Sequence, residues 1–296
     1  MTSSDFPDNS NGDGIRFTSS DGITAVPFEI ESYSYSGGEG TLVAWVKLTV
    51  DHDDDTRFYI HYDQTEAISP DPAANVWTNY VAVNHLHSDP DTTTSNKEIV
   101  GSKGDGKDTW NTMGQMNSDD QVTGKINGAL DFDGANDRVC LDDVDSQSNN
   151  NWNCSNSDSS SLFDARQQNR TVELWYWAQD ASVTTFETLF DGAGSSNGQA
   201  IYVYGGDVYA GNWKKSNTNR DYVSHTTTSQ EWHHVAFVTD DASITNTSGG
   251  SIILYHDGVK VDEETSDIQV DINTDPAALG GIWGKIRDHT GGNIGA

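Results

Sequence analysis

The sequence has few basic residues. Of its 296 residues, 16 are Lys or Arg and 46 are Asp or Glu, which gives a formal net charge of −30. A chain with this charge repels nucleic acids and anionic membranes, so we expect no nucleic-acid partner. Two compatible explanations remain for the acidity. One is a saline environment, where salt screens the self-repulsion, and the other is Ca²⁺ binding by Asp-rich loops.

Long apolar segments are also missing. No apolar run approaches the roughly 20 residues of a membrane-spanning helix, so we expect no membrane insertion. Residues 1–7 lack the basic region and apolar core of a signal peptide, so any export signal is expected outside this sequence. Hydrophobic residues make up only 34% of the chain, but 10% are aromatic, a share that a disordered chain lacks.

Cysteine is scarce. Cys140 and Cys154 flank a short polar loop, and a disulfide closing it is geometrically easy and suits a secreted protein. Two unpaired buried thiols are the alternative that this spacing leaves open. Glycosylation sequons begin at Asn153, Asn169 and Asn246, although a chain rich in Asn, Ser and Thr also produces sequons by chance.

Short strands joined by turns are the dominant pattern. Apolar and polar residues alternate over 42–50 and 57–62, and the acidic turn 51–55 between them predicts a hairpin. Residues 79–86 read as a further strand. Residues 171–178 carry apolar groups on both faces, which predicts a central strand.

A second hairpin is predicted around Asp257-Gly258, because both residues of such a loop need positive φ. No segment reads as a helix of three turns, so the fold class is all-β. We expect a small β-domain over residues 1–78, a linker strand and polar loop over 79–123, and a larger domain over 124–296.

Four segments of the larger domain resemble a known family. In order along the chain they are Gly124–Gly134, Glu173–Trp175, Glu231–Ala236 and Leu254–Val259. Together they are similar to the LamG-like jelly roll of the concanavalin A-like lectin/glucanase superfamily. The resemblance implies an antiparallel jelly-roll sandwich over roughly the last two-thirds of the chain.

The first 80 or so residues resemble a small β-domain of unknown function that precedes such modules in prokaryotic surface proteins. Asp13–Phe17, Pro27–Glu31 and Ala44–Lys47 carry this similarity. Compared with these families, the small domain lacks its first strands and the jelly roll lacks a last strand, so both ends look truncated. An open sheet edge allows strand exchange with another chain.

Catalytic motifs are lacking. The glucanases of the superfamily use Glu-x-Asp-x-x-Glu on one strand, and no such run occurs. Glu29 and Glu31 share one strand face but are expected to flank no aromatic platform, and no carboxylate spacing predicts a hydrolase. Adjacent strand residues point to opposite faces, so His233 and His234 are expected to be structural. We therefore expect a non-enzyme, with a glycoside hydrolase or lyase as the weaker alternative.

The resemblance also implies a calcium site, since laminin-G-like sandwiches often hold Ca²⁺ at the rim. Asp133, Asp137 and Asp191 lie in two similar strand-end turns and are the predicted ligands. The alternative is that these Asp-Gly sequences only form good turns.

A glycan site needs exposed aromatic rings beside hydrogen-bonding groups. Tyr204, Tyr209 and Trp213 lie in a Gly-rich stretch and are the predicted ligand-binding residues. Trp175, Trp177 and Trp232 lie within strands and are expected in the core.

These expectations favour a non-catalytic extracellular or cell-surface module for adhesion or glycan binding, whose partner is a glycan or a surface protein. The alternative is a structural subunit of a surface layer or filament, assembled by self-association or strand exchange.

Overall fold

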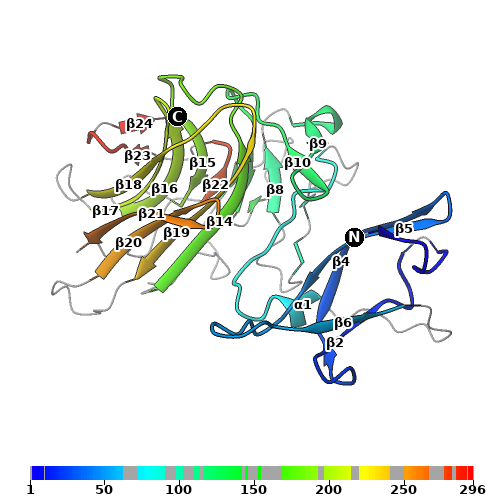
Figure 1. Cartoon of the computed structure of the whole chain (residues 1–296). Coiled ribbons are helices and arrows are strands. Elements are labelled where there is room, and N and C mark those ends of the chain that lie inside the picture. The colour runs from blue at the N-terminus through cyan, green and yellow to red at the C-terminus, as the bar shows by residue number, and fades with distance from the viewer. Residues whose placement is uncertain are drawn as a thin grey trace. The chain divides into compact units, whose positions relative to one another are not determined.

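The structure is a computed structural model of the whole chain (Figure 1). It describes residues 2–9, 11–62, 73–90, 98–99, 101–102, 110–113, 116–141, 144–145, 153–154, 169–192, 197–214, 220–240, 250–266, 277–281, 285–291 and 293–295. Within these residues every pairing with a known register is antiparallel, and the helices are the short α1 (Ala73–Val76) and the 3-10 turn Ser118–Asp120. The all-β prediction is confirmed.

The chain divides into two compact units. The first unit contains residues 1–87, 100–109 and 126–129, and the second contains 88–99, 110–125 and 130–296. The segment 79–123, predicted as a linker, is therefore shared between the two units. Residues 79–86 form no strand, and His85 at their end lies against Glu29 and Glu31 of the first unit.

The first unit contains two three-stranded sheets. One has the order β1-β5-β4 and the other the order β3-β2-β6. The core between them consists of Phe6, Ile15, Phe17, Val26, Phe28 and Leu42. The bounds of the strands are β1 (Thr2–Ser3), β2 (Arg16–Ser19), β3 (Ala25–Val26), β4 (Phe28–Ser36), β5 (Glu39–Val46) and β6 (Phe58–His61).

The hairpin predicted around residues 51–55 is wrong. Strand β5 pairs with β4 and β1, whereas β6 pairs with β2 in the other sheet. The tight turn at Gly37-Gly38 explains the difference: both glycines have positive φ, and they fold β4 directly back on β5. Both edges of β5 are then occupied, and β6 has to pair elsewhere.

The second unit contains two larger sheets, which lie one over the other (Figure 1). The eight-stranded sheet has the order β18-β17-β16-β15-β22-β11-β8-β7, and the four-stranded sheet has the order β14-β19-β20-β21. The strands of the larger sheet are β7 (Glu98–Ile99), β8 (Trp110–Met113), β11 (Arg138–Cys140), β15 (Glu187–Asp191), β16 (Asn197–Tyr204), β17 (Asp207–Lys214), β18 (Arg220–Thr226) and β22 (Ala278–Leu279). Those of the smaller sheet are β14 (Asn169–Trp177), β19 (Trp232–Asp240), β20 (Gly250–His256) and β21 (Val259–Ser266).

Side chains between these sheets form a sandwich core. Phe237, Ile252 and Leu254 point inward from β19 and β20 and are fully buried. A polar link also crosses the core, because the Gln199 amide of β16 donates to Thr239 Oγ1 of β19 at 2.9 Å. The predicted antiparallel sandwich is confirmed.

The hairpin predicted at Asp257-Gly258 is present. It joins β20 to β21, with φ of 49° at Asp257 and 79° at Gly258, as a type I′ turn requires. The prediction that residues 171–178 form a central strand is wrong, because β14 is the first strand of the four-stranded sheet. Only one face of β14 is covered by the opposite sheet.

Short strands complete the described part of the chain. A C-terminal hairpin of β23 and β24 packs Ile286 and Ile294 against Tyr202 and Trp213 of the eight-stranded sheet. Strands β16 and β17 are therefore covered on both faces. The remaining bounds are β9 (Gln121–Thr123), β10 (Gly128–Leu130), β12 (Val144–Asp145), β13 (Asn153–Cys154), β23 (Lys285–Arg287) and β24 (Asn293–Gly295).

Candidate functional site

Three tryptophans lie on the outer face of the four-stranded sheet. Trp175 and Trp177 alternate along β14 with the buried Tyr176, and their exposed fractions are 40% and 46%. Trp232 of β19 is the register partner of Trp177, and the two rings contact edge to face at a centroid distance of 5.8 Å. The prediction that these indoles belong to the core is wrong for Trp175 and Trp177. An end strand with one covered face leaves alternate side chains in solvent.

Polar groups flank this tryptophan face. His234 is the register partner of Trp175, with ring centroids 5.2 Å apart, and its Nε2 lies 3.8 Å from a carboxylate oxygen of Glu173. The Lys125 ammonium lies over the Trp175 ring at 5.4 Å from its centroid, within cation–π range. The face therefore combines the indole rings with a carboxylate (Glu173), an ammonium group (Lys125) and an imidazole (His234).

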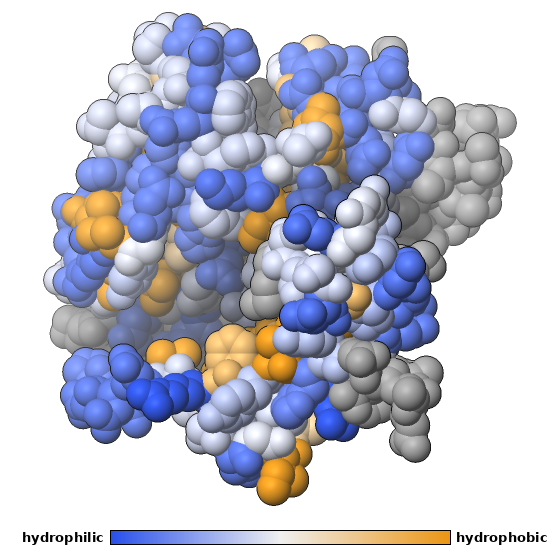
Figure 2. Space-filling view, turned by 45° about the vertical axis from the view of Figure 1, so that its right-hand side comes forward, coloured by the Kyte–Doolittle hydropathy of each residue, from blue (hydrophilic) through white to orange (hydrophobic). Residues whose placement is uncertain are grey.

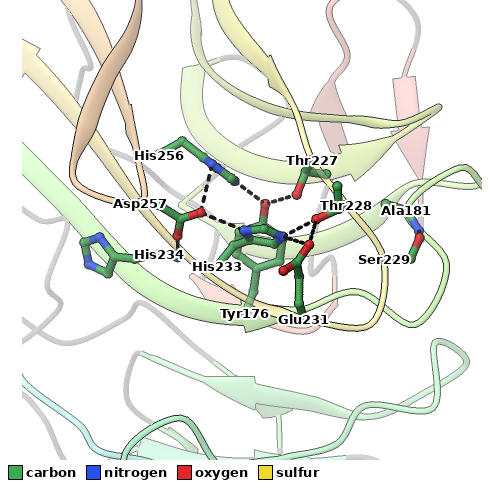
Figure 3. A network of polar contacts seen from close by, with 10 residues as sticks. All are labelled: Tyr176, Ala181, Thr227, Thr228, Ser229, Glu231, His233, His234, His256 and Asp257. Atoms are coloured by element: carbon green, nitrogen blue, oxygen red, sulfur yellow. Dashed lines mark hydrogen bonds and ion pairs between the residues drawn. The ribbon is translucent and has the colours of Figure 1, made fainter.

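A buried polar cluster lies on the inner side of the same four-stranded sheet (Figure 3). It contains His233 of β19, His256 of β20 and Asp257 of the turn. Asp257 Oδ2 lies 2.8 Å from His233 Nδ1 and 3.4 Å from His256 Nδ1. Both histidines are 7% exposed, whereas Asp257 is at the solvent edge. Among the described residues, these three are the group of His, Cys, Asp or Glu close enough to hold a metal ion.

His233 and His234 lie on opposite faces of β19, as predicted. Figure 3 shows the His233 ring directed into the cluster and the His234 ring directed away from it. His234 still contributes its backbone, because its N–H donates to Asp257 Oδ1 at 2.8 Å. Sequence reasoning considered only the pair of adjacent histidines and missed the group of His233, His256 and Asp257. The antiparallel register of β19 and β20 could have revealed this group, because it places His256 opposite Val235, close to His233.

The pKa values in this cluster follow from burial and from hydrogen bonding. Burial lowers the pKa of His256, and it raises the pKa of Tyr176 to about 12. Burial by itself raises the pKa of Asp257, but the bonds from the His234 backbone and the His233 ring outweigh this effect and lower the pKa. At neutral pH the uncharged imidazole of His256 therefore lies beside the ionised carboxylate of Asp257.

A second acid–imidazole cluster lies in the first unit. Glu29 and Glu31 of β4 accept hydrogen bonds from indole N–H groups, Glu29 from Trp77 at 2.5 Å and Glu31 from Trp45 at 2.8 Å. His85 Nδ1 lies 3.2 Å from Glu31, whose side chain is only 1% exposed. The prediction that the two glutamates flank no aromatic platform is wrong. A bulge in β4 and the packing of residues 77–87 create these contacts, and the sequence pattern does not reveal them.

Neither glutamate has the character of a general acid. Burial by itself raises the pKa of Glu31, but hydrogen bonds from His87 and Trp45 outweigh it and lower the pKa to about 2. For Glu29 the opposing bonds from His85 and Trp77 also lower the pKa. A glycoside hydrolase needs one carboxyl group with a raised pKa, so this pair is arranged to stay ionised.

The predicted calcium ligands are only partly brought together. Asp133 and Asp137 share a turn, in which Asp133 Oδ1 accepts from the N–H groups of Ala135 and Asn136, and the Asp133 N–H donates to Asp137 Oδ2 at 3.2 Å. Asp191 is fully buried in β15 and does not join them in a three-ligand group. Calcium binding stays a prediction.

The predicted glycan-binding residues are mostly covered. Trp213 is only 1% exposed, and Tyr209 stacks on His289 with a ring centroid distance of 4.1 Å. Tyr204 stacks on Phe186 at 4.4 Å. The prediction that Trp213 is an exposed binding residue is wrong, because the C-terminal hairpin packs over β17.

The remaining predicted sites concern covalent modification. Cys140 is disulfide-bonded, and no described cysteine is free. The side chain of Cys154 lies outside the described residues, so its pairing with Cys140 stays a prediction. Asn169 is exposed at the start of β14. The side chain of Asn153 and the whole of Asn246 lie outside the described residues, and glycosylation stays a prediction at all three positions.

The visible surface is strongly hydrophilic, with small separate hydrophobic areas (Figure 2). In the described part of the chain no helix is long and apolar enough to cross a membrane.

Comparison with known proteins gives structural similarity alone. No family model matches the chain, and no curated protein matches it. Among solved structures, domains LG4-5 of the mouse laminin alpha1 chain match 40% of this chain at 17% identity, with a TM-score of 0.31. The botulinum neurotoxin serotype D binding domain matches 66% at 11% identity, with a TM-score of 0.42. The receptor binding domain of the botulinum neurotoxin C/D mosaic matches 67% at 12% identity, with a TM-score of 0.43. The aligned regions span 29%, 42% and 43% of those chains.

Proposed function

We propose that this protein is a non-catalytic extracellular binding module, and that the tryptophan face of the four-stranded sheet binds glycans. The observation that carries the proposal is the exposure of Trp175 and Trp177, two indoles at alternate positions on one face of a strand. Large exposed aromatic side chains mark interaction sites when they cluster.

The chemistry of this face suits a sugar. The flat apolar side of a pyranose ring packs on an indole, and its hydroxyl groups need hydrogen-bond partners at the rim. Glu173, His234 and Lys125 provide acceptors and donors beside Trp175. Alternate residues of a strand lie about 7 Å apart, so Trp175 and Trp177 offer two consecutive stacking positions along β14.

The arrangement also supports binding without catalysis. The carboxyl groups of the two acid–imidazole clusters have lowered pKa values, so neither cluster supplies the protonated carboxyl group that a glycosidase uses as its general acid. The experiment that tests the proposal is a glycan array with the full chain, followed by affinity measurements for the best ligand with Trp175→Ala and Trp177→Ala.

We expect each substitution to weaken glycan binding at least tenfold, because each removes one stacking surface. The unfolding midpoint should change little, since both rings are already half exposed. Tyr59→Ala is the matched control, because Tyr59 is a 50% exposed aromatic residue of the first unit and should leave binding unchanged. An array without any bound glycan, or equal losses in the control, would overturn the proposal.

A further inference from the structure

The buried cluster beneath the tryptophan face has the form of a metal site. His233, His256 and Asp257 each offer one ligand atom, and these atoms lie within 4.8 Å of one another. Adjacent strands and a tight turn hold the three residues, so their positions do not depend on a long loop.

The outward nitrogen of His233 is held by its surroundings. Its Nε2 lies 2.9 Å from the Thr228 hydroxyl, and this hydroxyl donates its own proton to the Glu231 carboxylate. The hydroxyl can therefore accept the Nε2–H of the imidazole. In the metal-free protein the Nδ1 proton bonds Asp257 Oδ2. When a metal ion displaces this proton, the ring can carry its proton on Nε2 and present the lone pair of Nδ1 to the ion.

His256 and Asp257 are held in the same way. His256 Nε2 lies 3.1 Å from the Tyr176 hydroxyl, which in turn lies 2.7 Å from the Thr227 hydroxyl. The outer oxygen of Asp257 accepts the His234 N–H at 2.8 Å. In each of the three residues, one polar atom is therefore hydrogen-bonded to a neighbouring group, and the other polar atom remains available to a metal ion. Metal-ligating histidines commonly show this pattern of outer hydrogen bonds.

We propose that His233 Nδ1, His256 Nδ1 and Asp257 Oδ2 bind one divalent transition-metal ion of the Zn²⁺ class. Two imidazole nitrogens and one carboxylate oxygen are borderline ligands that select Zn²⁺ and its neighbours, whereas Ca²⁺ takes oxygen ligands alone. Three protein ligands leave a fourth position for water or another ligand, and Asp257 is the exposed member of the group.

The two distances from the imidazole nitrogens to Asp257 are close to those around a bound ion. Tetrahedral ligands at about 2.0–2.1 Å from Zn²⁺ are separated from one another by about 3.3 Å. The distance from His256 Nδ1 to Asp257 Oδ2 is already 3.4 Å, and the distance from His233 Nδ1 to this oxygen, 2.8 Å, has to open by about half an ångström. The short distance is the hydrogen bond of a proton that the ion replaces.

The site does not depend on the proposed glycan function. The two histidines point into the sandwich and Asp257 lies in the turn at its edge, whereas Trp175 and Trp177 point out, so zinc binding and glycan binding can fail separately.

The test is calorimetric titration of the chelator-treated full chain with Zn²⁺. Excess Mg²⁺ is present to occupy the many surface carboxylates. We expect one tight site per chain. His256→Gln and His233→Gln should each weaken it at least tenfold, and His234→Gln, the neighbouring outward residue, should leave it within twofold of the original.

A second readout is the visible absorption of bound Co²⁺. A four- or five-coordinate site gives an intense d–d band, and Zn²⁺ should abolish this band by competition. If the glutamine variants do not fold, Asp257→Asn replaces them, because Asn suits the same turn position and is a poor metal ligand. Equal zinc affinity in Asp257→Asn or in both histidine variants, or an unchanged band in them, overturns the proposal, and so does the absence of a tight site in the original chain.

Discussion

The two acid–imidazole clusters of this chain are built from similar groups but differ in their electrostatics. In the first unit, Glu31 is almost fully buried, and its hydrogen bonds lower its pKa and raise that of His87. In the second unit, Asp257 lies at the surface and burial lowers the pKa of His256. The first cluster favours a charged pair and the second a neutral imidazole.

The two clusters also differ in how their carboxylates are stabilised. Glu31 accepts bonds from Trp45, His87 and Asn127, so a buried carboxylate is compensated by several donors at once. Burying such a charge without its partners is costly. The second cluster exposes its carboxylate and buries only groups that can be neutral, so its loss should cost less.

The largest expected effect comes from neutralising the buried acid. Glu31→Gln keeps the size of the side chain but removes the charge that the donors face, and we expect the first unit to lose about 3 kcal/mol of unfolding free energy. Hydrogen exchange followed by mass spectrometry measures each unit separately during denaturation. Glu39→Gln, an exposed glutamate on β5, is the control and should change little. A loss as small as the control's would mean that the indole and imidazole donors are satisfied without the charge.

Acid should reproduce part of that loss. The contribution of Glu31 is present above its ordinary pKa of 4.5 and is lost as the pH falls toward its folded value of about 2. The contribution of His87 is present below its ordinary pKa of 6.5 and is lost as the pH rises through its raised folded value.

We therefore expect the first unit to be most stable between these two limits and to lose about 2 kcal/mol on acidification from pH 5 to near pH 2.5. Urea midpoints measured over this range test the expectation. Glu31→Gln should flatten the acid limb, and an equally steep limb in that variant would assign the pH dependence to other carboxyl groups.

The smallest expected effect is in the second cluster. Asp257→Asn preserves the turn, because Asn is favoured beside Gly258 in a type I′ turn, but it weakens the bond to His233. We expect a loss of about 1 kcal/mol in metal-free protein, as for one hydrogen bond to a partly exposed group. Denaturation in chelator gives the value, and Glu264→Gln on β21 is the exposed control. A loss as large as that of Glu31→Gln would remove the contrast between the clusters.

Much of the fold could be predicted from local sequence. Asp257-Gly258 between alternating strands predicted the β20–β21 hairpin, because both residues of a type I′ turn need positive φ and Asp-Gly is favoured there. The adjacent histidines were correctly placed on opposite faces of β19, since side chains alternate along any strand. The pairing of β6 with β2 was not predictable in this way, because it depends on which sheet edges are still free.

The candidate sites depended more on tertiary structure. The sequence contains Trp175 and Trp177 at alternate positions, but their exposure follows from the position of β14 as the first strand of its sheet. Trp213 lies in a sequence that looks like a surface loop, and the C-terminal hairpin buries it. Burial depends on what packs over a strand, and residues distant in sequence decide that.

The sequence by itself determined the all-β class, the acidic surface and the alternation of side chains, because these follow from composition and from the strand period. Only the tertiary structure decided which rings are exposed and which acids meet which imidazoles. His233 and Asp257 are 24 positions apart in the sequence, and Trp77 and Glu29 are 48 apart. The register of paired strands and the packing of a non-strand segment bring them together, and no local pattern specifies either one.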